Sequence, residues 1–108
     1  MTVESFAKEL GLGILCMPYP EREIDGAYIG DLLSWVMGKA SQGNVWITIM
    51  SNINTIAVAT LVDTSCILLC ENVSLDPEVL NAAKDKGVNV LSSSLTAYEV
   101  AKAASKLI

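Results

Sequence analysis

The sequence predicts an α/β domain, with a mostly parallel sheet of four to five short strands and flanking helices. Three observations support this. Uninterrupted apolar runs at Val45–Met50 and Cys66–Cys70 are typical of strands that are covered on both faces. Segments with helical periodicity and capping residues alternate with such runs, which favours parallel strands joined by helices. At 108 residues the chain has the length of one domain, over residues 1–108.

The first elements are predicted from periodicity and from turn residues. Apolar residues recur at helical spacing from Val3, and Thr2 can cap the first turn, so a helix is expected over residues 3–10. Gly11 ends this helix. The apolar run Leu12–Met17 predicts a strand, because it is short and stops before a proline.

The next pair of elements is a strand over Ile24–Ile29 and a helix over Asp31–Ala40. We expect the Asp31 carboxylate to interact with the N-terminal end of this helix, where the helix dipole is positive. Trp35 lies at the margin of the apolar stripe of the helix. Two roles are open for it, a flank of the core or an anchor for a partner surface.

Residues 53–62 fit two structures, since β-branched residues favour a strand and the asparagines before them resemble helix caps. We predict a helix, because the flanking strands need a crossover if they run parallel. Such a helix is apolar almost all round and needs cover on two sides. We expect the sheet to cover one side of this helix and a second subunit to cover the other. The predicted interface consists of Trp35, Ile53, Ile56 and Val58.

The last third of the chain carries the clearest helix signals. Asp76 and Pro77 form an N-cap and a proline at the first helical position, and Gly87 ends that helix. A short strand follows at Val88–Leu91. The capping box Thr96–Glu99 then opens the last helix.

Composition limits the partners. The hydrophobic content is 52%, yet no run approaches the roughly 20 apolar residues of a membrane span. The surplus indicates a buried interface, so a homodimer is predicted and a membrane partner is not. With a net charge of -5 and lysines spread singly, the chain has no basic patch for nucleic acid. The N-terminus lacks the layout of a signal peptide, and we expect a cytoplasmic protein.

Reactive groups are scarce. The sequence has no histidine and none of the phosphate-binding or serine-nucleophile glycine motifs. Its three cysteines, Cys16, Cys66 and Cys70, are interpreted as buried hydrophobes. A metal site is the alternative, but Cys66 and Cys70 on one strand would lie about 13 Å apart, too far for one ion. We therefore predict no catalytic residue, metal or cofactor. A small enzyme would have to use Asp25, Asp31 or a cysteine thiolate.

Small polar residues follow several predicted strands. In parallel sheets ligands sit beyond the carboxyl ends of the strands, where helix N-termini can hold an anion. The candidate ligand-binding residues are Gly30, Asp31, Ser51, Asn52, Asn54, Ser92, Ser93 and Ser94. Two interpretations are open. These residues bind a small anion or adenine nucleotide, or they only cap the helices that follow.

Two long segments suggest a family. The run Ile24–Trp46, IDGAYIGDLLSWVMGKASQGNVW, precedes a buried strand and a short apolar helix, and LDPEVLNAAKDKGVNVLSSSLTAYEVA follows. Together they resemble the DRTGG domain over about residues 2–107. The most specific parts are Gly30 and Asp31, the Gly43–Thr48 turn and strand, and the Ser92–Thr96 approach to the last helix. The glycine pair of the family's name has no match, since Glu71 and Asn72 follow the Cys66–Cys70 strand.

The resemblance implies an accessory module like the N-terminal domain of HPr kinase/phosphorylase. Similar modules occur in phosphate acetyltransferases and between the CBS domains of some pyrophosphatases, and free-standing copies accompany iron hydrogenase gene clusters in anaerobes. It also implies regulation or dimer contact rather than catalysis. The sequence thus favours a homodimeric binding module, with a small enzyme or a scaffold subunit of a redox complex as alternatives.

Overall fold

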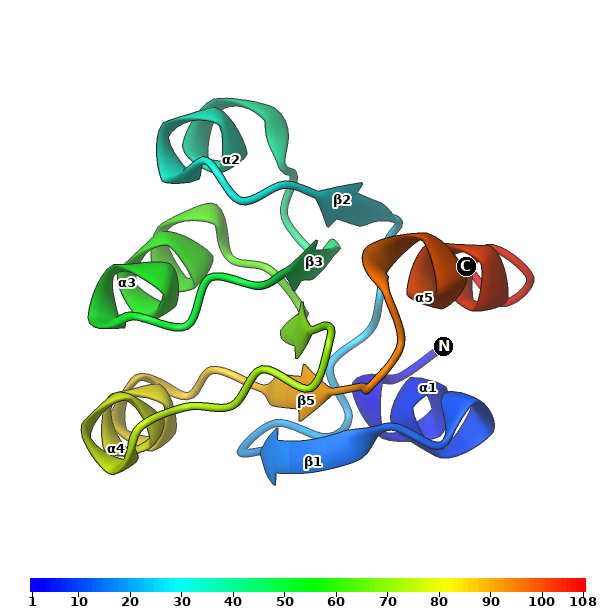
Figure 1. Cartoon of the computed structure of the whole chain (residues 1–108), viewed down its shortest axis with the longest axis horizontal. Coiled ribbons are helices and arrows are strands. Elements are labelled where there is room, and N and C mark those ends of the chain that lie inside the picture. Colours follow the sequence, from blue (N-terminus) through cyan, green and yellow to red (C-terminus); the bar gives the residue numbers. More distant parts are fainter.

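The structure, a computed structural model, describes all 108 residues as a five-stranded sheet between two layers of helices (Figure 1). The helices are α1 (Val3–Leu10), α2 (Leu33–Lys39), α3 (Ile53–Val62), α4 (Pro77–Lys86) and α5 (Ala97–Ala104). The strands are β1 (Gly13–Cys16), β2 (Ala27–Ile29), β3 (Val45–Thr48), β4 (Cys66–Leu69) and β5 (Val90–Ser92). The predicted α/β class and the mostly parallel sheet are confirmed.

The strand order is β1-β5-β4-β3-β2. Strands β2 to β5 are parallel neighbours in chain order, and only β1 is antiparallel, to β5. Crossovers of one hand between successive neighbours place their helices on the same face of a sheet. Helices α2, α3 and α4 accordingly cover one face, and α1 and α5 cover the other (Figure 1).

Two apolar clusters, one on each face, hold the layers together. Phe6 of α1 and Val100 of α5 pack with Leu68 of β4 on one side. On the other side Trp46 of β3 packs with Ile56 of α3 and with residues of α4. All residues of β3 and β4 are buried, as their uninterrupted apolar runs predicted.

The helix predicted over residues 53–62 is confirmed as α3. It lies between α2 and α4 and over the sheet, so neighbours of the same chain cover three of its sides. Thr55, Ile56, Val58 and Ala59 are the buried residues. Elements of the same chain therefore bury much of the apolar surface of α3.

Two strands begin two or more residues later than predicted. Strand β2 begins at Ala27 rather than Ile24, because Gly26 has a φ of 69° and breaks the extended backbone. Strand β5 covers Val90–Ser92 rather than Val88–Leu91. The Asn89 carbonyl still accepts a hydrogen bond of 2.9 Å from the Ile67 N–H, and the Asn89 side chain bonds the Tyr19 backbone. None of the five helices has the length and apolar character needed to span a bilayer.

Candidate functional site

The carboxyl ends of β2, β3, β4 and β5 lie next to one another at one edge of the sheet, since these strands are parallel neighbours. The predicted ligand-binding residues stand in the four segments that follow these strands. The structure thus brings them to one edge, here called the carboxyl edge. The hydrogen bonds that each side chain already makes show whether it is available to bind a ligand.

Asp31 joins the ends of two strands. Its Oδ1 accepts hydrogen bonds from Thr48 Oγ1 at 2.8 Å and from the Ile49 backbone N–H at 3.1 Å. The Thr48 hydroxyl in turn accepts one from the Met50 N–H at 3.1 Å. The prediction that Asp31 interacts with its own helix is wrong. Helix α2 begins at Leu33, and its N-cap Leu32 makes no side-chain capping bond.

Gly30 has a structural reason to be glycine. A Cβ at this position would lie 2.8 Å from Cε2 of Tyr28, closer than real contacts allow. The Gly30 carbonyl accepts a hydrogen bond of 2.8 Å from Nε1 of Trp46, a fully buried residue. The Gly30 N–H also donates to the Ile47 carbonyl at 3.2 Å, so β3 bonds both the N–H and the carbonyl of Gly30.

The other polar residues of the carboxyl edge also serve their own segments. Asn52 caps α3 by accepting a hydrogen bond of 3.2 Å from the Thr55 N–H. Ser93 accepts one of 3.1 Å from the Leu95 N–H. Thr96 and Glu99 form the predicted capping box. The capping interpretation accounts for these contacts without a ligand, while Asn54 and Ser94 are exposed to solvent.

The connections leaving β4 and β5 diverge, because α4 lies on one face of the sheet and α5 on the other (Figure 1). In α/β proteins such a divide is where a ligand crevice opens. Here backbone bonds close it: the Glu71 N–H donates to the Leu95 carbonyl at 2.8 Å, and the Asn72 N–H donates to the Ser93 carbonyl at 2.9 Å. Glu71 and Asn72 adopt left-handed conformations, with φ of 55° and 61°.

The cavities of the chain lie elsewhere. A cavity of about 210 Å³ lies between β2 and α5, and small and apolar residues line it. We call it the β2–α5 cleft; it is lined by Gly26, Ala27, Ile29, Ile47, Ala101, Ala104, Ser105 and Ile108. The two others lie beside α1 and beside Arg22. The sequence did not predict the β2–α5 cleft, because the cleft depends on the order of the strands in the sheet.

The three cysteines are buried, as predicted. Burial raises the pKa of the Cys66 thiol to about 12, against small opposing effects of Ser65 and Arg22. Burial, with the nearby charges of Glu71 and Asp31, raises the pKa of Cys70 to about 11. The pKa of Cys16 is also raised by burial. All three thiols stay protonated near neutral pH, so none is a ready nucleophile.

Of the predicted interface residues, two are exposed and two are not. Ile56 and Val58 pack into the core beneath α3, where they cannot meet a second chain. Trp35 is 60% exposed and Ile53 is 46% exposed. Leu61, which the prediction missed, is 69% exposed on the same helix as Ile53. The position of Ile56 and Val58 corrects the predicted interface, because an all-round apolar helix does not show in its sequence which side faces the sheet.

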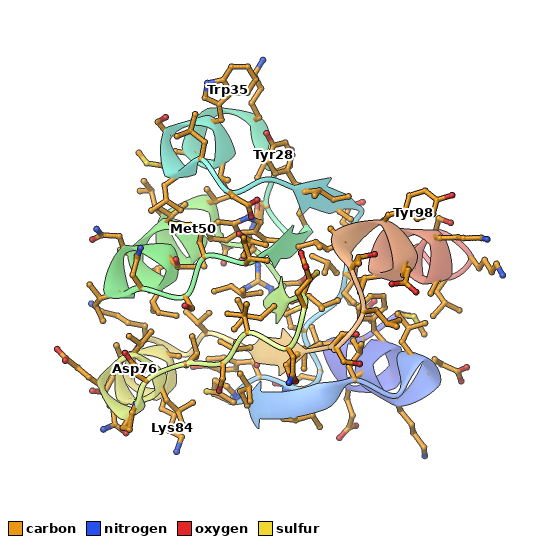
Figure 2. The ribbon with its side chains drawn as sticks, viewed as in Figure 1. Tyr28, Trp35, Met50, Asp76, Lys84 and Tyr98 are labelled. Carbon is orange, nitrogen blue, oxygen red and sulfur yellow. The ribbon has the colours of Figure 1, made fainter.

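We use the name α2–α3 surface for the exposed apolar side chains of these two neighbouring helices: Trp35 and Met37 of α2 with Ile53, Ala57 and Leu61 of α3. No charged residue occurs between Ala40 and Val62. The only charge in either helix is Lys39, whose Nζ lies 5.6 Å from the centroid of a Trp35 ring. Figure 2 shows Trp35 on the side of α2 that faces away from α3.

Comparisons with known proteins add a family and a fold. A family model described as the DRTGG domain matches residues 29–107. A similar solved structure is that of the CBS and DRTGG domains of the regulatory region of Clostridium perfringens pyrophosphatase, complexed with its activator diadenosine tetraphosphate. The TM-score is 0.75 at 10% identity, over 94% of this chain and 44% of that chain. No curated protein sequence matches.

Proposed function

Because the chain belongs to the DRTGG domain family, we propose that it is a non-catalytic regulatory module that works by protein association, as a homodimer. It spans less than half of the similar pyrophosphatase region, so it corresponds to one part of a larger regulatory unit there. That region contains the DRTGG domain and is described as regulatory, which supports the assignment.

The observation that carries the proposed association with other proteins is the α2–α3 surface. Two adjacent helices present Trp35, Ile53 and Leu61 to solvent with a single charge among them. Burying apolar surface gains about 25 cal/mol per Å², and aromatic residues are enriched where proteins bind one another. Such a surface suits contact with a different protein, such as a subunit of a redox complex, and the β2–α5 cleft is the candidate surface for a second copy.

The reactive groups support a non-catalytic role. Asp31 is engaged by Thr48 and by the Ile49 backbone, and the thiols are buried with raised pKa values. An enzyme of this chain would need a base or nucleophile that is both accessible and activated. We place the module in the cytoplasm, in keeping with its three cysteines, which are all free thiols.

A second candidate function is the sensing of an adenine nucleotide or small anion at the carboxyl edge. It is favoured by the nucleotide activator bound to the regulatory region of the similar pyrophosphatase. The N-termini of α2, α3, α4 and α5 all open at this edge. In this chain the candidate contacts are Gly30, Ser51, Asn52 and Ser94 with their neighbours.

Sedimentation velocity over a range of concentrations tests the first candidate. We expect a reversible dimer, and a chain that stays monomeric at every concentration would contradict it. Thermal unfolding with ATP, diadenosine tetraphosphate or phosphate tests the second, because a ligand of the folded state raises the midpoint with concentration. A midpoint unaffected by any of the three compounds would exclude nucleotide or phosphate sensing.

A further inference from the structure

We propose that the homodimer forms through the β2–α5 cleft, with Tyr98 of each chain inserted into the cleft of the second copy. This inference rests on the proposed function, since it assigns the self-association to one surface. It leaves the α2–α3 surface free for a different protein. The argument uses the shape, the charge and the size of the two surfaces.

The cleft exists because β2 is covered on one face only. Helices α2, α3 and α4 serve one side of the five strands, whereas only α1 and α5 serve the other. Since α5 packs on β3, the outer strand β2 has no helix above it on that side. Ile29 is consequently 50% exposed and forms a wall of the cleft with Ala27.

Tyr98 is the protruding counterpart of this hollow. It is 75% exposed, the most exposed large hydrophobic side chain of the protein. Figure 2 shows it on α5, outside the packed layers. Along the helix it stands one turn before Ala101 and about two turns before Ser105, both of which line the cleft. A bulky side chain and a hollow therefore lie next to each other on one face.

In a two-fold symmetric dimer the same face of both chains forms the contact, so the protrusion of each chain meets the hollow of the other. With the axis near Ala101, two antiparallel α5 helices bring each Tyr98 over the partner's cleft. The cleft of about 210 Å³ is large enough for the ring, since a cavity of about 150 Å³ holds benzene. The small side chains of Ala101 and Ser105 let the two helices approach closely.

The charges of α5 match this arrangement. Glu99 lies in its first turn, and Lys102 and Lys106 lie in and just after its last turn. In an antiparallel pair the acidic end of each helix lies beside the basic end of its partner, which is favourable at the rim of an interface.

Pairing through the free edge of β2 is disfavoured by contrast. Val45 and Ile47 bond the Gly26 and Gly30 backbone on the inner side, so Ala27 and Ile29 point their backbone groups outward. However, Asp25 and Asp31 flank this short strand. Two antiparallel copies would set these like charges against one another, which destabilises strand pairing.

Size sets the expected strength of the dimer. A stable interface buries about 800 Å² on each partner, which would be about one seventh of the 5738 Å² surface of this chain. Eight residues of α5 and three of β2 offer a smaller face than that. We therefore expect a reversible dimer with a dissociation constant in the micromolar range.

Sedimentation velocity of the full chain and of three variants tests the proposal. Tyr98→Ser removes the protrusion, and Ser105→Arg blocks the far wall of the cleft. Both residues are exposed, so the variants should fold, as circular dichroism can verify. We expect each to weaken dimerisation at least tenfold. Trp35→Ser is the matched control, an exposed aromatic on the other face, and it should dimerise like the wild type.

The outcomes separate the two proposals. Dimerisation lost in Tyr98→Ser and Ser105→Arg and kept in Trp35→Ser supports the cleft. Dimerisation lost only in Trp35→Ser, or kept in all three variants, overturns the cleft while the homodimer stands. A wild-type chain that is monomeric throughout overturns both the cleft and the homodimer.

Discussion

At the level of single residues, Asp31 shows how one carboxylate can organise the carboxyl edge. It receives hydrogen bonds from a side chain and from a backbone N–H of the neighbouring strand. Removing it leaves the buried Thr48 hydroxyl without its acceptor, and a hydrogen bond to a charged group contributes about 1.5–3 kcal/mol.

Asp31→Ala is accordingly expected to destabilise the protein by about 2 kcal/mol, and Asp31→Asn by less because the amide oxygen still accepts. Urea unfolding of both variants measures this. A structural role predicts that Asp31→Asn binds its partner normally. A variant as stable as the wild type would show that these two hydrogen bonds contribute nothing.

Cys66 gives the protein a dependence on alkaline pH. Its pKa in the folded protein is about 12, against an ordinary value of 9.0. The folded state thus holds the proton more tightly than the unfolded state, and this part of the stability is complete below pH 9 and is lost as the pH rises through 12.

Between pH 9 and pH 10.5 we expect the free energy of unfolding to fall by up to about 1 kcal/mol per pH unit from this thiol alone. Cys66→Ala should start less stable, because it loses buried volume, but decline less steeply. Equal slopes for the variant and the wild type would show that the thiol has an ordinary pKa in the folded state.

Residue roles that depend on near neighbours in the chain were predictable. The capping box Thr96–Glu99 and the burial of the cysteines are examples, since sequence pattern and apolar surroundings define them. The partner of Asp31 was not predictable. It stands 17 residues further along, and only the register of β2 against β3 brings the two together.

Among the elements, the connection between β4 and α4 carries backbone strain. Glu71 and Asn72 both have positive φ, and for a residue with a Cβ this conformation costs roughly 1–2 kcal/mol. Asparagine tolerates it better than glutamate does. The sequence lacks the family's glycine pair, yet these two positions have the backbone conformation that glycine favours.

Glu71→Gly should relieve this strain and, after the greater flexibility of the unfolded glycine is subtracted, stabilise the protein by about 0.5 kcal/mol. This corresponds to a rise of about 2–4 °C in the thermal midpoint. Glu78→Gly, within α4, is the control and should lower the midpoint. A lower midpoint for Glu71→Gly would mean that the Glu71 side chain outweighs the strain.

The elements themselves were largely predictable, because caps, prolines and apolar runs are local signals. Helix α3 was identified correctly although its composition was ambiguous, since two parallel neighbours need a crossover. Its orientation was not predictable. The sequence could not distinguish the buried Ile56 and Val58 from the exposed Ile53 and Leu61.

In the whole molecule, the two helix layers cover the sheet unequally. Three helices cover one face, two cover the other, and β2 is left partly bare. The sequence predicted the layers and the apolar surplus. The β2–α5 cleft needed the order of all five strands, which no local pattern encodes.

Dimerisation makes the apparent stability depend on protein concentration, because the dimer draws on the folded monomer only. We expect the thermal midpoint to rise as the wild-type concentration is increased from well below to well above the dissociation constant. Tyr98→Ser should show a constant midpoint over the same range. Differential scanning fluorimetry can compare the two. A concentration-independent wild type would argue against a coupled dimer.

The stretch from Ala40 to Val62, which has no charged side chain, has a consequence for recognition. Helix α3 itself presents no charged side chain to a protein that binds it, so this helix adds no electrostatic attraction to the encounter. Encounter should then be slow and unassisted, with selectivity resting on shape. Neither added salt nor mild acid should release such a partner, whereas a hydrophobic detergent could compete for the same helices.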